Sequence, residues 1–526
     1  MDLNGANMNH SSPSVPGSSW RGALQDLPAI LSDVSIWQYV VTVMIGFVVY
    51  DQVMYLKRKG SIAGPRFKIP LTGPFLQALN PKFEAYLAQW ASGPLSCVSV
   101  FHKFVVLVSD RDIAHKVFKS PSHASPCIVP LARTLLGPSS FVFLQGAAHH
   151  AYRRGLAPLF SARAMAGYLP AVDAVLDVYF SRFIAATAAA AGQPTPFLRP
   201  FREINCALSC RTFFGSYISD AAVERIADDF YAVTAAMELV NVPGAEYIPF
   251  TRPWRGRRVA AAVRAEFAAC AERCKAEMRR GAEPGCLVDY WVREMMESER
   301  YAREGGEKPG VVVREFTAGE MGDTVFAFLF ASQDASSSAT CWAFQLLAQH
   351  PGVLERVRAE NVAAREAGRG GVEMLEGLEY TNAVVREVLR LRPPVIFVPY
   401  EATRDFRVTE GYTVPKGAMV VPSCWPALHD AAVYPEPDRF VPERWLGDGG
   451  GAEAKGRNWL VFGAGPHECL AKRWVPLYLT AMIGKAAMEL EWTHGATETS
   501  EEIKVFATLF PMDGCRLAFR KRAEGL

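Results

Sequence analysis

The chain has 526 residues, of which 50% are hydrophobic, 11% aromatic and 21% charged. This composition excludes a disordered polymer, a collagen-like repeat and a small disulfide scaffold. The formal net charge is +2, so the chain has no excess of basic residues of the kind that binds nucleic acid, and no nucleic-acid partner is expected. The 11 cysteines form no CxxC pair and predict buried thiols in a reducing compartment.

The N-terminal region has the pattern of a membrane anchor. Residues 1–33 are rich in Ser, Gly, Pro and Asn and predict a short disordered tail. Residues 34–56 begin with the charge-free run VSIWQYVVTVMIGFVVY, which spans a bilayer as a helix if its ends snorkel. The basic residues 57–59 then predict a lumenal tail, where Asn9 is a glycosylation acceptor, and a cytosolic main body. A buried core helix is the alternative.

The rest of the chain predicts one mainly α-helical domain with small β-sheets over residues 80–526. Gly-Pro pairs at 64–65 and 73–74 predict a stiff hinge over residues 57–79. Apolar residues recur at helical spacing in most segments that follow. The clearest helices are expected at 83–91 and 261–280. The clearest strands are expected at 97–101, 104–109 and 418–423.

The segment QGAAHHAYRR at 145–154 predicts a helix that carries His149, Arg153 and Arg154. Basic residues on a helix more often form a solvated face than a binding site. This segment therefore carries no function on its own.

Residues 326–351, FAFLFASQDASSSATCWAFQLLAQHP, are apolar at both ends and polar in the middle. Serine can bond back to the helix backbone, so this pattern favours one long helix with a polar middle over two helices and a loop. Asp334 and Ser336 are its candidate functional residues.

Glu387 and Arg390 lie in a predicted helix that ends at Arg392-Pro393-Pro394. A Glu–Arg pair at this spacing is usually a solvated ion pair of a few tenths of a kcal/mol. The segment FVPERW follows and contains Arg444.

The strongest motif is FGAGPHECLA at 462–471. Its glycines, Gly465 among them, allow a tight turn close to a flat ligand. Cys469 follows, just before an apolar helical stretch at 471–488, where the helix dipole favours a thiolate. A Gly-rich turn with a buried cysteine is the alternative.

Together, in this order and spacing, these motifs resemble those of the cytochrome P450 family. The resemblance implies a haem b cofactor with Cys469 as the axial ligand of the iron and the main chain at Phe462 and Gly465 against the haem. It also implies that His467 and Arg153 bind the propionates. His149 stands where the family has Trp, and Ala471 where it usually has Gly.

The resemblance further implies a buried structural network of Glu387, Arg390 and Arg444, and proton delivery to bound oxygen by Asp334 and Ser336. Ala335 replaces the usual Thr, so the identity of the relay hydroxyl stays open.

Within the family, the stretches SQDAS (332–336) and EEIKVFATLFP (501–511) are similar to those of fungal sterol C-22 desaturases. This similarity implies formation of the 22,23 double bond of a sterol in ergosterol biosynthesis, with electrons from NADPH through NADPH-cytochrome P450 reductase, at the endoplasmic reticulum membrane. A basic patch of Arg154, Lys472 and Arg473 is expected to steer the reductase. The expected substrate pocket consists of Phe326, Phe330, Ile396, Phe397, Val398, Phe506 and Leu509.

Three alternatives stay open at this point. The first is another sterol-oxidising cytochrome P450, such as a 14α-demethylase. The second is a haem-thiolate isomerase or dehydratase that needs no reductase. The third is a non-catalytic, membrane-anchored sterol- or haem-binding protein.

Overall fold

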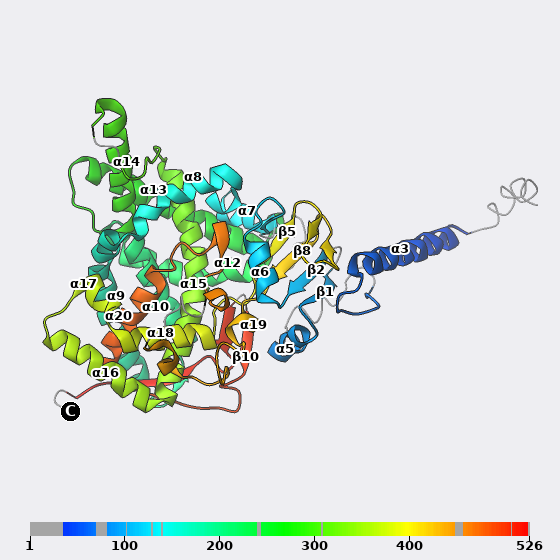
Figure 1. Cartoon of the computed structure of the whole chain (residues 1–526). Helices are drawn as coiled ribbons and strands as arrows, with labels where there is room; N and C mark the ends of the chain where they lie inside the picture. The colour runs from blue at the N-terminus through cyan, green and yellow to red at the C-terminus, as the bar shows by residue number, and fades with distance from the viewer. Residues whose placement is uncertain are drawn as a thin grey trace, which may run out of the picture.

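The computed structural model describes residues 35–69, 82–100, 103–127, 130–137, 140–238, 244–306, 309–447, 456–506 and 508–523. The predicted tail with Asn9 and the second half of the predicted hinge lie outside these ranges. Helices dominate the described chain, and the largest sheet lies at the side from which the N-terminal helix leaves the body (Figure 1). The predicted mainly α-helical fold with small sheets is therefore confirmed.

Helix α3 (Ile36–Lys59) projects away from the body (Figure 1). Most of its apolar side chains are exposed, and among the described residues it is the one helix long and apolar enough to cross a membrane. It covers the predicted anchor and ends at Lys59 instead of residue 56, because the basic residues complete its last turn.

Residues 60–69, the first half of the predicted hinge, fold back onto the end of α3. The Tyr55 hydroxyl donates a hydrogen bond to the Pro65 carbonyl at 2.8 Å. The ammonium of Lys68, which is 5% exposed, pairs with Asp51 at 2.6 Å. Asp51, the charge that interrupts the apolar run, thus binds the segment that follows the helix.

The main sheet has the strand order β1-β2-β8-β5-β3 and contains all three predicted strands. Strand β2 pairs with β1 in antiparallel and with β8 in parallel orientation. A three-stranded sheet has the order β4-β12-β9, and β6-β7 and β10-β11 are hairpins. The strands are β1 (Leu95–Val100), β2 (Lys103–Val108), β3 (Ala124–Pro126), β4 (Thr195–Pro196), β5 (Tyr400–Ala402), β6 (Phe406–Arg407), β7 (Thr413–Val414), β8 (Met419–Pro422), β9 (Leu490–His494), β10 (Ile503–Phe506), β11 (Thr508–Pro511) and β12 (Arg516–Lys521).

The helices enclose the long α15, which contacts α10, α13, α18 and α20. They are α5 (Phe83–Ala91), α6 (Arg111–Phe118), α7 (Pro130–Leu136), α8 (Gly146–Leu156), α9 (Ala162–Ala189), α10 (Leu198–Phe214), α11 (Asp220–Asp229), α12 (Tyr231–Glu238), α13 (Arg252–Arg279), α14 (Leu287–Glu304), α15 (Ala318–Gln349), α16 (Pro351–Glu366), α17 (Gly371–Glu376), α18 (Glu379–Leu391), α19 (Trp425–Leu428) and α20 (Trp474–Glu489).

Helix α15 is continuous over 32 residues, as the sequence predicts. Thr317 caps its start in a reciprocal capping box with Glu320. The serine-rich middle stays helical because hydroxyls bond back along the helix, as from Ser337 to the Gln333 carbonyl at 2.6 Å. At Gly322 the helix touches α13, since a Cβ there would lie 2.8 Å from the Ala268 nitrogen.

Candidate functional site: a cysteine loop beside a buried charge network

The loop from Phe462 to Cys469 is closed on itself. The amide of Cys469 donates to the Phe462 carbonyl at 2.9 Å, and that of Glu468 to the Gly465 carbonyl at 3.1 Å. Gly465 has a φ of +74°, and a Cβ there would collide with the Phe118 carbonyl at the end of α6. Only glycine fits this position, so the predicted tight turn is present.

Cys469 differs from the other cysteines in its accessibility. All 11 cysteines lie within the described residues, and Cys469 alone among them is exposed. Although the sulfur is accessible, the protein atoms around it desolvate the thiol and raise its pKa, while the Ala471 amide and Arg153 lower the pKa. A metal cation bound at this accessible sulfur would supply the charge that stabilises its thiolate.

The expected effect of the helix dipole on Cys469 is corrected by the structure. Helix α20 begins at Trp474 and not at residue 471, so Cys469 lies more than a turn before the first helical residue. The dipole acts within about one turn of a helix end. Burial is therefore the largest influence on the pKa of this thiol, and the pKa is raised instead of lowered.

Basic side chains of α8 meet the loop. Arg153 donates to the Glu468 carbonyl at 2.6 Å, and the His149 and His467 rings stack with centroids 4.0 Å apart. Burial, followed by neighbouring cations and imidazoles, lowers the pKa of both histidines to about 4. Two neutral imidazoles beside one guanidinium provide donors for carboxylate groups, as the propionates of haem require.

Glu387 and Arg390 form the predicted buried network with Arg444. Both Glu387 and Arg390 have 0% side-chain exposure, and two Arg390 nitrogens donate to the two carboxylate oxygens at 2.9 Å. Arg444 donates from Nε at 3.0 Å, and the Trp445 indole N–H donates at 2.8 Å. The amide of Val441 supplies a further hydrogen bond at 3.0 Å.

The remaining donors of Arg390 are also satisfied. They bond the carbonyls of Leu428, Pro437 and Arg439 at 2.7–3.2 Å. The sequence missed Trp445, although it directly follows Arg444. Its ring lies 5.0 Å from that of Trp459, just before the cysteine loop, so the charge network supports this loop through two tryptophans.

On α15, Asp334 is held by residues that the sequence did not indicate. Arg202 of α10 forms an ion pair with one carboxylate oxygen, and Thr234 of α12 donates to the other at 2.8 Å. The Arg202 guanidinium also lies 5.4 Å from the centre of the Tyr231 ring. Arg202 and Asp334 are far apart in the chain and belong to no local motif, so only the packing of three helices brings them together.

Ser336 is buried on the side of α15 that packs on α20. Its side chain lies beside the Tyr478 hydroxyl, where it partly offsets the rise in the Tyr478 pKa that burial causes. Ala331 is exposed and Ala335 half-buried. Because Ala331 and Ala335 lie one turn apart, they share a face of small side chains on the enclosed helix.

The expected pocket residues fall into three groups. Phe326 is fully buried against Phe230, about half a turn around α15 from Ala335, whereas Phe330 is partly buried. The 506–509 segment meets the chain two residues before Ile396, because the Leu509 amide donates to the Pro394 carbonyl at 3.2 Å.

In the second group, Ile396 is buried and Val398 partly buried, and Phe397 contacts Tyr86 and Trp90 of α5 at ring distances of 4.9 and 5.8 Å. In the third, Leu509 is fully buried, while the side chain of Phe506 lies outside the described residues.

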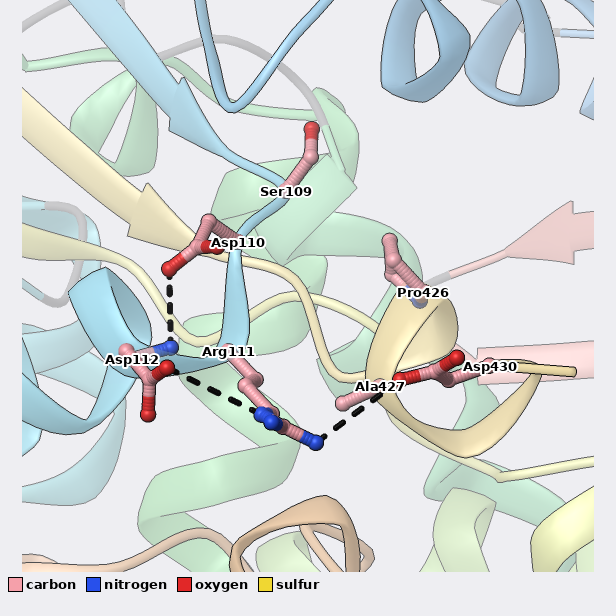
Figure 2. Close-up of a pocket in the computed structure, with 7 residues that line it drawn as sticks. All are labelled: Ser109, Asp110, Arg111, Asp112, Pro426, Ala427 and Asp430. Atoms are coloured by element: carbon pink, nitrogen blue, oxygen red, sulfur yellow. Dashed lines mark hydrogen bonds and ion pairs between the residues drawn. The ribbon is translucent and has the colours of Figure 1, made fainter. Parts of the chain in front are cut away.

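The pocket drawn in Figure 2 is a different, polar site of about 340 Å³ between the start of α6 and α19. Asp110 accepts two amides of α6 at 2.9 Å, and Arg111 lies 3.8 Å from Asp112 and 3.7 Å from Asp430. These groups satisfy one another across the gap (Figure 2). The charged side chains of this pocket therefore connect α6 to the segment after α19, and the pocket is separate from the site described above.

The expected basic patch is largely neutralised. Lys472 pairs with Glu468 and Arg473 with Glu376, both at 2.7 Å. Arg154 is exposed, with no acidic partner among the described residues.

A protein that holds haem through sulfur needs one cysteine within reach of an iron and cations for two carboxylates. The accessible Cys469, with Arg153, His149 and His467 around it, meets both requirements, so the fold and site define a haem-thiolate protein.

The family model described as cytochrome P450 matches residues 63–485, and the chain belongs to this family. Family membership implies a haem cofactor and a redox partner that supplies electrons.

The chain is 61% identical over 527 residues to the cytochrome P450 monooxygenase oblE of Emericella variicolor, covering 97% of this chain and 98% of that protein. It is 64% identical over 494 residues to the C-22 sterol desaturase ERG5B of Gibberella zeae, covering 92% of each. The solved structure of retinoic acid bound cyanobacterial CYP120A1 superposes with a TM-score of 0.71 at 22% identity over 88% of this chain and 100% of that one. This likeness supports the fold.

Proposed function

We propose that this protein is a sterol C-22 desaturase of ergosterol biosynthesis. It introduces the 22,23 double bond into a sterol side chain with O₂ and NADPH-derived electrons, which NADPH-cytochrome P450 reductase delivers. The observation that carries the proposal is 64% identity over 92% of both chains with a protein named for this activity. Helix α3 anchors the protein in the endoplasmic reticulum membrane, with the tail at 1–33 lumenal and the catalytic domain at 80–526 cytosolic.

In this proposal Cys469 would hold the iron of haem b, the main chain at Phe462 and Gly465 would contact the porphyrin, and Arg153 and His467 would bind its propionates. When bound, the haem supplies the oxygen chemistry, and the thiolate favours cleavage of the O–O bond. The chain itself orients the cofactor and the substrate. Glu387, Arg390 and Arg444 keep the cysteine loop in shape and have no role in the chemistry.

Asp334 is proposed to control proton delivery from α15. Its carboxylate is bound by Arg202 and Thr234. Asp334 can therefore pass a proton toward bound oxygen only if one of these two contacts opens or if a water molecule connects the carboxylate to the oxygen. Ser336 remains a candidate relay from the sequence. Its position beside Tyr478 favours a structural role, however, and Ala335 supplies no hydroxyl.

A hydroxylating monooxygenase is the second candidate function. It is favoured by the 61% identity over 97% of the chain to a protein named a monooxygenase and not a desaturase. Both candidates use the same haem site and differ in the product that leaves it.

The test is reconstitution of the full chain in lipid vesicles with the reductase, NADPH and a 22,23-saturated sterol, followed by mass spectrometry. A product two mass units lighter with a 22,23 double bond is expected. A product sixteen units heavier alone would support the second candidate, and loss of the 14α-methyl group a demethylase. Turnover without the reductase would indicate an isomerase, and sterol binding without oxygen consumption a non-catalytic protein.

A further inference from the structure

Four side chains along one edge of α15 reach the C-terminal hairpin β10–β11 and the turn before it. They are Ser338, Trp342, Gln345 and Gln349, spaced so that they form one stripe along the helix. The first three have 0% exposure. A buried polar stripe is costly unless its donors are satisfied, so its partners matter.

The partners are main-chain and side-chain oxygens of residues 500–509. The Ser338 hydroxyl and the Trp342 indole N–H both donate to the Leu509 carbonyl, at 2.5 and 3.0 Å. Gln345 donates to the Ser500 carbonyl at 2.9 Å, and Gln349 to the Glu501 carboxylate at 2.6 Å.

Leu509 is therefore held from both sides. Its carbonyl accepts two donors from α15, and its amide donates to the Pro394 carbonyl at 3.2 Å. Within the hairpin Leu509 pairs with Val505, and Phe506 pairs with Thr508. The register of the hairpin on α15 is thus set at the buried Leu509 carbonyl, one residue after the Phe506–Thr508 pairing that closes the hairpin.

The same contacts connect the hairpin to the part of α15 around Asp334, which is proposed to deliver protons to bound oxygen. Ser338 lies one turn, about 6 Å along the axis, after Asp334. The Thr508 hydroxyl donates to the Asp334 carbonyl at 3.5 Å. A shift of Leu509 therefore moves its neighbour Thr508 relative to Asp334.

We propose that Ser338 and Trp342 are positioning residues that set the choice between desaturation and hydroxylation of the substrate side chain. The proposal rests on the proposed function. Both outcomes use one O₂, two electrons and two protons. Desaturation removes two hydrogen atoms from adjacent carbons and forms two waters, whereas hydroxylation leaves one oxygen atom on carbon and forms one water. In this proposal the position of the hairpin determines where the sterol side chain lies beside the reacting centre, and that position determines the ratio of the two products.

The chain offers a matched control in the neighbouring serine. Ser337 has the same 0% exposure as Ser338, but its hydroxyl donates to the Gln333 carbonyl of its own helix and not to the hairpin. Ser338→Ala and Ser337→Ala thus remove the same atom from adjacent buried positions. Trp342→Phe removes the second donor to Leu509 and keeps an aromatic ring.

The experiment compares the full-length haem-loaded variants in two measurements. One is the ratio of hydroxylated to desaturated sterol, and the other is amide hydrogen exchange of residues 503–511. Ser338→Ala and Trp342→Phe are each expected to raise the ratio about fivefold, as the loss of one buried hydrogen bond allows, and to speed exchange in the hairpin. Ser337→Ala is expected to change neither.

An unchanged product ratio in both Ser338→Ala and Trp342→Phe would overturn the positioning role, as would an equal shift in Ser337→Ala. Unchanged amide hydrogen exchange in the hairpin would show that Ser338 and Trp342 do not anchor the hairpin, and the positioning role depends on this anchoring. Failure of the proposed function is seen separately, because the wild-type protein would then form no 22,23 double bond. If one variant fails to fold, the other still decides the outcome.

Discussion

The cysteine loop with its charge network and the middle of α15 with its hairpin are built on different principles. Around Glu387, one carboxylate receives donors from Arg390, Arg444, Trp445 and the Val441 amide, all within two short stretches of the chain. Around Asp334 and Leu509, the side-chain contacts join residues a hundred or more positions apart. The contacts of the first region follow from local sequence motifs, whereas the contacts of the second region follow from the tertiary packing of distant segments.

This difference has a physical reason. A fully buried carboxylate needs charged donors in fixed geometry, so it restricts residue types strongly and leaves a pattern in the sequence. A main-chain carbonyl accepts from any donor of the right reach, so serine, tryptophan and glutamine all serve on α15. We therefore expect substitutions in the first region to abolish cofactor binding or folding, and those in the second to change coupling and product.

The largest effect is expected for Cys469→Ala. Removal of the one exposed cysteine should abolish the thiolate-type Soret shift of the reduced protein with carbon monoxide, because no other sulfur takes its place. Cys127→Ala is the control, since Cys127 is the next most accessible thiol. A Soret shift that persists in Cys469→Ala would refute the ligand assignment.

Glu387→Gln should come next. It leaves Arg390 and Arg444 without their buried counter-charge and should lower the free energy of unfolding by about 3–5 kcal/mol, measured by denaturation of the full-length protein in detergent. Glu277→Gln is the control, because it breaks an exposed ion pair with Arg280 at the same sequence spacing. It should change the free energy of unfolding by less than about 1 kcal/mol. Equal effects would show that the network is not needed for stability.

Asp334→Asn tests the second region. Loss of the carboxylate should slow product formation about tenfold or more and raise the fraction of electrons released as peroxide, because the proposed proton delivery depends on the Asp334 carboxylate and its contacts with Arg202 and Thr234. Ser336→Ala should stay near wild type, because this hydroxyl lies beside Tyr478. Peroxide release that rises in Ser336→Ala and not in Asp334→Asn would assign the relay to the serine.

The smallest effect is expected at the start of α15. Arg314, together with the Thr317 amide, lowers the pKa of Glu320 from 4.5 to about 2, although burial opposes this. A lowered pKa stabilises the fold above the pKa of the unfolded state, and this stability is lost as the pH falls toward 2. Glu320→Gln should therefore cost about 1 kcal/mol at pH 7.

Thermal unfolding between pH 7 and 2 measures this cost. The wild-type and Glu320→Gln curves should converge as the pH falls below 4.5. A constant difference across this range would mean that the charge of Glu320 contributes nothing.

By itself the sequence determined the long apolar N-terminal helix α3, the long helix α15, three of the five strands of the main sheet and the Glu387 network with Arg444. Each follows from a local signal: an apolar run, a periodicity or a motif with a fixed spacing. The glycine at 465 is of the same kind, because its positive φ excludes other residues.

Only the tertiary structure decided the partners of Asp334, the orientation of Ser336, the burial of Phe326 and the raised pKa of Cys469. These properties depend on which elements pack against each side chain and how far a helix end lies from it. The long-range contacts that set them leave no local trace in the chain. Periodicity indicates that a helix is buried, but it does not tell which face meets the core and which meets the cofactor.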